Sequence, residues 1–159
     1  MKIFGADYSK SMIKIAAKAL PGGHFKYLDA VSLNYKQNFF DSIIIFSAAQ
    51  FFPDKSYLTK VINNCFKFLK KDGNLFIGEL VEKNKQKEFN KYRKNQLGAR
   101  EYKLKYQGKK NSNLILFSID RAEIISLLSS KFKNIEVFNC ILRGNEKEVF
   151  RFNVCCKKK

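Results

Sequence analysis

The stretch that decides the fold reads Ile3-Phe4-Gly5-Ala6-Asp7-Tyr8-Ser9-Lys10-Ser11-Met12. An apolar strand delivers the carboxylate of Asp7 directly into a helix, for which Ser9 is a suitable N-cap residue. In doubly wound α/β folds, an acidic residue at the carboxyl end of the second strand accepts hydrogen bonds from ribose hydroxyls. That residue normally follows a glycine-rich turn by about 20 residues, and no such turn precedes Asp7. The stretch therefore predicts an α/β nucleotide-binding fold that is N-terminally incomplete.

Strand-like and helix-like segments alternate along the rest of the chain, which is typical of an α/β fold with a mainly parallel sheet. The apolar run at 40–46 predicts a strand covered on both faces. The connection at 143–147 is short, so it predicts that the last two strands are antiparallel. Strands are predicted at about 2–6, 25–28, 40–46, 74–80, 135–142 and 148–156, and helices at about 10–20, 55–69 and 119–131.

Particular residues are expected to shape the helices. Met12, Ile15 and Leu20 share one apolar face of the first helix. The run 70–73, with two lysines and a glycine, is expected to end the second helix, and Ser118 to cap the third. We predict a single domain over residues 1–159, in which the charged segment 81–117 is a lid or insertion on the substrate side.

The segments carry short motifs in a fixed order, namely Gly5-x-Asp7-x-Ser9-x-x-Met12, Tyr27-Leu28-Asp29-Ala30, Phe40-Asp41-Ser42-Ile43-Ile44, Ser47-Ala48-Ala49-Gln50-Phe51 and Leu69-Lys70-Lys71-Asp72-Gly73-Asn74-Leu75-Phe76-Ile77. This order resembles the class I, Rossmann-like methyltransferases that use S-adenosylmethionine, the methyltransferase-domain family. The resemblance implies a doubly wound, mainly parallel sheet with an antiparallel C-terminal hairpin. The first strand and the glycine-rich loop of that family have no counterpart here, so Met1 is an internal start or the chain is a remnant. We favour the internal start.

The resemblance implies S-adenosylmethionine as the cofactor and assigns its adenosine part to the first two strand ends. Asp7 would accept hydrogen bonds from the ribose hydroxyls, and Tyr8 belongs to the same group of cofactor-binding residues. Met12 would pack against the adenine face. Asp29 would accept from the adenine amino group, and the backbone N–H of Ala30 would bind ring nitrogen N1.

The same resemblance places Ser47 beside the methionine part of the cofactor and Gln50 and Phe51 on the substrate side. No protein nucleophile is required, because methyl transfer depends on positioning and on exclusion of water. Catalytic residues are therefore not assigned.

Each assignment has an alternative from the residues alone. Asp7 would also suit the positive end of a helix dipole, and Asp29 would also suit a turn. Met12 and Phe51 would also suit ordinary packing. The occurrence of Asp7 and Asp29 at the ends of adjacent strands favours a ligand-binding edge.

The net charge of +17 raises the possibility of a nucleic-acid partner. Most cations are Lys, and only five Arg occur, whereas phosphate-binding surfaces favour the bidentate Arg side chain. We therefore favour a compositional origin of the charge. Within 81–117, cations such as Lys91, Arg93 and Lys94 would attract an anionic acceptor, although a solvated helix is the alternative.

Other classes are limited by composition. Four cysteines without a C-x-x-C pair and a single His make a metal site or a disulfide framework improbable. The sequence contains no run of about 18 apolar residues, so no membrane span is predicted. We therefore expect a cytoplasmic methyltransferase for a small-molecule acceptor. A non-catalytic basic module for RNA or a protein partner, an inactive remnant and a nicotinamide-dependent enzyme remain as alternatives.

Overall fold

The computed structural model describes residues 1–98, 101, 116–140 and 150–159. The chain divides into two compact units, Met1–Lys36 and Gln37–Lys159, which we call unit 1 and unit 2. The prediction that residues 1–159 form a single domain stays a prediction.

Unit 1 consists of two parallel strands connected by a helix. The hydroxyl of Ser9 accepts a hydrogen bond from the Met12 N–H at 3.4 Å, so the predicted N-cap of this helix is confirmed. The elements of unit 1 are β1 (Phe4–Asp7), α1 (Lys10–Ala19), β2 (His24–Tyr27) and the 3-10 turn η1 (Ala30–Ser32).

The predicted apolar face of α1 is largely exposed. Met12 is 50% exposed, Ile15 is 60% exposed and Leu20 is 45% exposed, whereas Ile13 and Ala16 are half-buried. All residues of unit 1 are described, and none of them is fully buried. Unit 1 is therefore held together by backbone hydrogen bonds and shallow packing rather than by a core.

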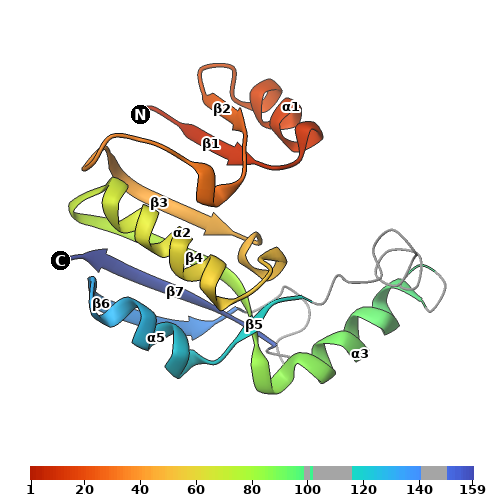
Figure 1. Ribbon diagram of the computed structural model, residues 1–159. Helices are drawn as coiled ribbons and strands as arrows, with labels where there is room; N and C mark the ends of the chain where they lie inside the picture. The colour runs from red at the N-terminus through yellow and green to blue at the C-terminus, as the bar shows by residue number, and fades with distance from the viewer. Residues whose placement is uncertain (99–100, 102–115, 141–149) are drawn as a thin grey trace. The chain divides into compact units, whose positions relative to one another are not determined.

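Unit 2 is built on one sheet with the strand order β3-β4-β7-β6, in which β5 also pairs with β4. Figure 1 shows that α2 and α5 lie on the same face of this sheet. The elements of unit 2 are β3 (Phe40–Phe46), η2 (Ala49–Phe51), α2 (Lys55–Phe68), β4 (Leu69–Glu82), η3 (Lys83–Lys85), α3 (Gln86–Leu97), β5 (Ser118–Ile119), α5 (Arg121–Ser129), β6 (Phe132–Asn139) and β7 (Arg151–Lys158).

The strand directions confirm the predicted class. β4 is parallel to both β3 and β5, and β7 is antiparallel to both β4 and β6. The chain is thus an α/β protein with parallel strands followed by an antiparallel C-terminal pair. The connection predicted at 143–147 lies outside the described residues.

The main core of unit 2 lies between the sheet and the helices α2 and α5. α2 contributes Leu58 and Ile62 to this core, and α5 contributes Ile124 and Leu128, all 0–1% exposed. The apolar spacing predicted for the helix at 55–69 is therefore confirmed. On the sheet, alternate residues of β4 and β7 face these helices and are buried, namely Leu75, Ile77, Phe152, Val154 and Cys156.

The prediction that residues 40–46 are covered on both faces is wrong. None of the seven residues of β3 is buried, and Ile44 and Phe46 are 69% and 59% exposed. Within the described residues, β3 is paired with β4 alone, and β1 with β2 alone, in a separate sheet. A continuous apolar run is compatible with an edge strand as well as with a covered central strand.

The second helix ends within one residue of its predicted end at 69, but the prediction that the run 70–73 ends it is wrong. Leu69 is the C-cap of α2 and the first residue of β4. The run 70–73 is an irregularity in the pairing of β3 with β4. A Cβ atom on Gly73 would lie 2.9 Å from the carbonyl oxygen of Lys70 and 3.1 Å from that of Asp41. The glycine is therefore required by close backbone approach and not by a helix cap.

The predicted start of the third helix is wrong by two residues. α5 follows Asp120, whose N–H donates to Glu123 Oε2 at 3.3 Å in a capping box. Ser118 belongs to the short strand β5. An acidic residue followed by Glu three positions later is the stronger N-terminal signal.

Candidate functional site

Asp7 and Asp29 occupy neighbouring strand ends in unit 1. β1 and β2 are in parallel register, with Asp7 opposite Tyr27. The carbonyl oxygen of Asp7 accepts a hydrogen bond from the Leu28 N–H at 3.1 Å, one residue before Asp29. The predicted placement of both carboxylates at one sheet edge is therefore confirmed.

Asp7 is half-buried and is fixed by the turn that leads into α1. Its Oδ1 atom accepts a hydrogen bond from the Ser9 N–H at 2.7 Å. This contact holds the carboxylate in one direction at the start of the helix and leaves Oδ2 for another donor. The structural role weighed for Asp7, at a helix N-terminus, is compatible with ligand binding by the second oxygen.

Asp29 is exposed and is the N-cap of η1. Its Oδ1 atom accepts from the Val31 N–H at 3.0 Å, which is the turn role weighed for this residue. Ala30 is the first residue of η1 and is half-buried.

Tyr8 and Met12 are large hydrophobic side chains close in sequence to Asp7, and they are 69% and 50% exposed. Neither belongs to a packed core, so the packing alternative for Met12 does not describe it. Their assignment to the cofactor stays a prediction.

Ser47 and Gln50 form a second polar group, in unit 2. Ser47 follows β3 with a φ of 53° and donates its N–H to the carbonyl oxygen of Gly78 at 3.3 Å. Gln50 is 7% exposed, and its Nε2 atom donates to Ser47 Oγ at 3.1 Å and to the Ser47 carbonyl oxygen at 3.3 Å. Phe51 is 44% exposed. The structure therefore brings Ser47 and Gln50 together and leaves Phe51 on the surface.

An ion pair that the sequence did not predict adjoins this group inside β4, next to Gly78. Glu79 has a φ of 62° at an irregularity in the pairing of β4 with β7. Its N–H donates to Asn153 Oδ1 at 3.0 Å, and Arg151 Nη1 lies 2.8 Å from its Oε2. The side chains of Arg151 and Glu79 are only 15% and 13% exposed. A charged residue inside the apolar run 75–81 was the available sequence signal.

The Glu79–Arg151 pair is continuous with the contacts of α3. The guanidinium groups of Arg93 and Arg151 lie 5.3 Å and 5.4 Å from the centre of the Phe89 ring. Arg151 Nε is buried and has no hydrogen-bond partner among the residues that the structure describes. Non-glycine residues with positive φ and unpaired buried donors often occur at functional sites.

A second ion pair lies at the end of β4. Arg121 donates from Nε and Nη2 to the two carboxylate oxygens of Glu82, both at 3.0 Å, and from Nη2 to Asn139 Oδ1 at 2.8 Å. The bidentate geometry joins β4 to α5 and β6.

Backbone contacts connect the Ser47–Gln50 group to the start of α3. The Phe117 N–H donates to the carbonyl oxygen of Gln50 at 2.8 Å. Gln86 Nε2 donates to the carbonyl oxygen of Leu116 at 2.7 Å. The two residues that precede β5 thus bridge η2 and α3.

Two of the four thiols are kept protonated by burial. Burial raises the pKa of Cys65 and of Cys156 to about 12, so both remain protonated at neutral pH. Among the described residues, no three His, Cys, Asp or Glu side chains form a group able to hold a metal ion. No helix within the described ranges is long and apolar enough to cross a membrane.

Comparison with known sequences points to one class of protein. The family model described as "Methyltransferase domain" matches residues 1–77. Demethylmenaquinone methyltransferase of Thermotoga maritima is 34% identical over 84 residues, which are 53% of this chain and 35% of that protein. The chain thus spans about a third of the length of this curated relative.

Solved structures share the fold over nearly the whole chain. A methyltransferase of Methanosarcina mazei described as SAM-dependent has a TM-score of 0.69 at 17% identity and covers 99% of this chain and 82% of its own. The N-methyltransferase NodS of Bradyrhizobium japonicum, solved with S-adenosylhomocysteine, has a TM-score of 0.68 at 12% identity. The match covers 99% of this chain and 66% of the NodS chain. The predicted resemblance to the class I, Rossmann-like S-adenosylmethionine-dependent methyltransferases is confirmed.

Proposed function

We propose that this protein is an S-adenosylmethionine-dependent methyltransferase that acts on a small-molecule acceptor. The observation that carries the proposal is the pair of strand-end carboxylates, Asp7 and Asp29, on the parallel strands β1 and β2. The match of the methyltransferase-domain family to residues 1–77 includes both carboxylates. NodS, which shares the fold, binds S-adenosylhomocysteine, the product of this cofactor.

In unit 1, the proposed role of Asp7 is to accept hydrogen bonds from the ribose hydroxyls through Oδ2, since Oδ1 is bonded to the Ser9 N–H. Asp29 would accept from the adenine amino group, and the Ala30 N–H would donate to N1. Met12 and Tyr8 are exposed and would pack against the adenosine.

In unit 2, Ser47 is the proposed contact for the methionine part of the cofactor, and Gln50 and Phe51 face the acceptor in this proposal. When bound, the cofactor supplies an electrophilic methyl group. The chain contributes orientation and exclusion of water. Gln50 suits orientation because its amide is held by two hydrogen bonds to Ser47, and Phe51 suits exclusion of water because its ring is apolar and exposed.

The proposed acceptor is anionic, and the proposed location is the cytoplasm. The exposed lysines that the structure describes in the 81–117 segment, Lys83, Lys87, Lys91 and Lys94, would favour an anionic acceptor. The four cysteines are all free thiols, which supports the cytoplasm as the compartment of this enzyme.

Calorimetric titration with S-adenosylhomocysteine tests the proposal. We expect the wild-type protein to bind and Asp7→Asn to weaken binding by about tenfold, since one charge-assisted hydrogen bond is worth roughly 1.4 kcal/mol or more. Asp54→Asn is the matched control. Asp54 caps α2 through a hydrogen bond from the Tyr57 N–H at 2.8 Å, and Asn caps helices as well as Asp. A flat titration of the wild-type protein would overturn the proposal.

A further inference from the structure

α3 is anchored to unit 2 by one apolar side. Phe89 is 3% exposed and packs with Val81, Leu116 and Phe150 in a small buried cluster, against which Tyr92 is partly buried. The rings of Phe89 and Phe150 lie 5.9 Å apart. These contacts fix which side of α3 faces the solvent.

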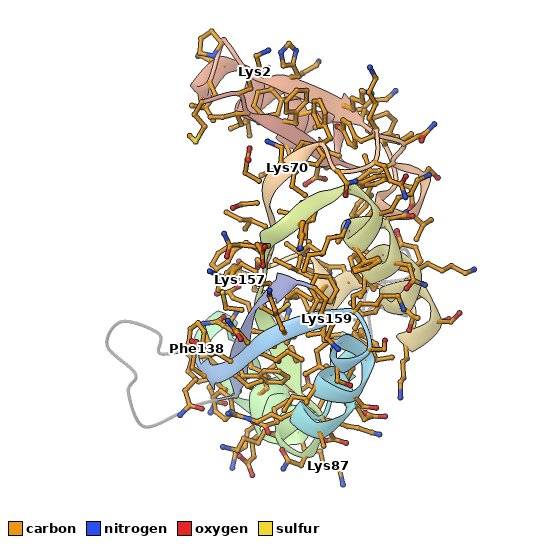
Figure 2. The ribbon with its side chains drawn as sticks, turned by 90° about the vertical axis from the view of Figure 1, so that its left-hand side faces the viewer. Lys2, Lys70, Lys87, Phe138, Lys157 and Lys159 are labelled. Atoms are coloured by element: carbon orange, nitrogen blue, oxygen red, sulfur yellow. The ribbon has the colours of Figure 1, made fainter. Side chains whose placement is uncertain are left out.

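The solvent side of α3 presents a row of lysines. Lys87, Lys91 and Lys94 are exposed and are spaced i, i+4 and i+7, so they lie on one side of the helix. Figure 2 shows the side chain of Lys87 extending away from the ribbon. In the part of the chain that the structure describes, none of the three forms an ion pair, whereas Lys83 lies 3.7 Å from Asp120 and 3.8 Å from Glu123.

We propose that the Lys87–Lys91–Lys94 row of α3 binds the phosphate backbone of a nucleic acid. The helix rises by about 10 Å from Lys87 to Lys94, and successive phosphates of one strand advance about 3.4 Å along the duplex axis. The three ammonium groups therefore match a short run of phosphates by charge and by length. Contacts of this row with phosphates do not require the cofactor, and they concern a ligand other than the small-molecule acceptor proposed above for the same segment.

The surroundings of the row favour a nucleic acid over a membrane. Stable binding of a helix to a membrane surface requires apolar side chains that enter the lipid. Among residues 86–95 of α3, whose side chains the structure describes, no large hydrophobic side chain is strongly exposed. On α1, by contrast, exposed Met12 and Ile15 accompany the lysines.

The lysines of α1 are a control that distinguishes the position of the lysines from their abundance in the chain. Lys10, Lys14 and Lys18 are exposed and are spaced i, i+4 and i+8 along α1. If the basic charge is only compositional, the two helices should contribute equally to the binding of polyanions. If the row on α3 is an interaction surface, α3 should dominate.

The experiment measures fluorescence anisotropy of a labelled 20-nucleotide oligouridylate and of a labelled 20-base-pair DNA duplex, at 50–200 mM salt. We compare the wild type with Lys87→Gln/Lys91→Gln/Lys94→Gln and with Lys10→Gln/Lys14→Gln/Lys18→Gln. The α3 variant should weaken binding to at least one probe by about tenfold or more and reduce the salt slope by about 2–3. The α1 variant should change Kd by less than about twofold. Gln has nearly the helix propensity of Lys, so both variants should keep the wild-type circular dichroism.

Three outcomes would overturn the proposal: no binding of either probe by the wild type, equal losses in the two triple variants, or binding to phosphatidylserine vesicles that depends on α3 without nucleic-acid binding. A single charge reversal, Lys91→Glu, provides a second test. It should weaken binding more than Lys91→Gln does, because it adds repulsion from the phosphates.

Discussion

Unit 1 and unit 2 contain similar secondary-structure elements but differ in how many side chains they bury. In each, a helix connects parallel strands, β1 to β2 and β3 to β4. Unit 2 buries whole side chains between its sheet and its helices, whereas no residue of unit 1 is fully buried. The comparison teaches that the carboxylates proposed to bind the cofactor lie in the less well supported unit, as is common for ligand-binding segments.

The largest effect is expected from matched truncations of one isoleucine in each unit. Ile124 in α5 is 0% exposed and Ile15 in α1 is 60% exposed. Ile124→Ala should lower the free energy of unfolding by about 2–5 kcal/mol through lost burial and a new cavity. Ile15→Ala should change it by less than about 0.5 kcal/mol. Urea unfolding followed by circular dichroism measures both, and similar losses would contradict the contrast.

The second prediction compares the carboxylate of Glu79, inside β4, with that of Asp7, at the end of β1. Glu79→Gln leaves the buried guanidinium of Arg151 without its counter-charge and should cost about 2–4 kcal/mol of stability. Asp7→Asn keeps an oxygen that can accept from the Ser9 N–H, so its cost should stay below about 0.5 kcal/mol. Thermal unfolding in the absence of ligand measures both changes.

A double variant is the control for the cause of the Glu79 effect. Glu79→Gln/Arg151→Met removes the unpaired charge and should recover part of the lost stability. If the double variant is less stable than Glu79→Gln, the backbone irregularity at Glu79, rather than the ion pair, is the important feature.

Parts of this architecture were predictable because they depend on local patterns. The alternation of apolar periods gave the order of the elements, and the boundaries of β3 were predicted without error. Ser9 was recognised as an N-cap from its side chain and position. The adjacency of Asp7 and Asp29 followed from the rule that parallel strands end at one edge.

The remaining features depend on contacts between distant residues. The apolar run of β3 does not reveal which edges and faces of the strand are covered. Gly73 looked like a helix terminator because its close approach to Asp41 depends on strand pairing. The Glu79–Arg151 pair joins residues from β4 and β7, and a single sequence does not indicate such pairing.

The third prediction concerns local opening. Backbone amides of β4 and β7, which lie inside the sheet of unit 2, should exchange with deuterium at least about 100-fold more slowly than those of β1 and β2. Mass spectrometry of exchanged peptides measures the rates. S-adenosylhomocysteine should slow exchange mainly at β1 and β2 if the proposed adenosine contacts form. Equal protection of the two units without ligand would contradict the contrast in their support.

The smallest effect is expected from two surface ion pairs of unit 2, Lys70–Asp41 and Lys133–Asp72. Hydrogen bonds and charge from Lys70 lower the pKa of Asp41, and those from Lys133 lower the pKa of Asp72. A native pKa below the unfolded value means that the contribution to stability is complete above about pH 4 and is lost as the pH falls through the native pKa.

Lys70→Met/Lys133→Met removes both partners, so the thermal midpoint of the variant should fall less steeply than that of the wild type as the pH decreases below about 4. Lys60→Met is the control, because Lys60 is exposed on α2 and forms no ion pair among the described residues. It should reproduce the acid dependence of the wild type. The paired carboxylates are exposed, and solvent screens their charge. The change in thermal midpoint caused by Lys70→Met/Lys133→Met should therefore be smaller than the change caused by Glu79→Gln. If the thermal midpoint changed as much as it does in Glu79→Gln, the stability of unit 2 would depend on its surface charges as well as on its core.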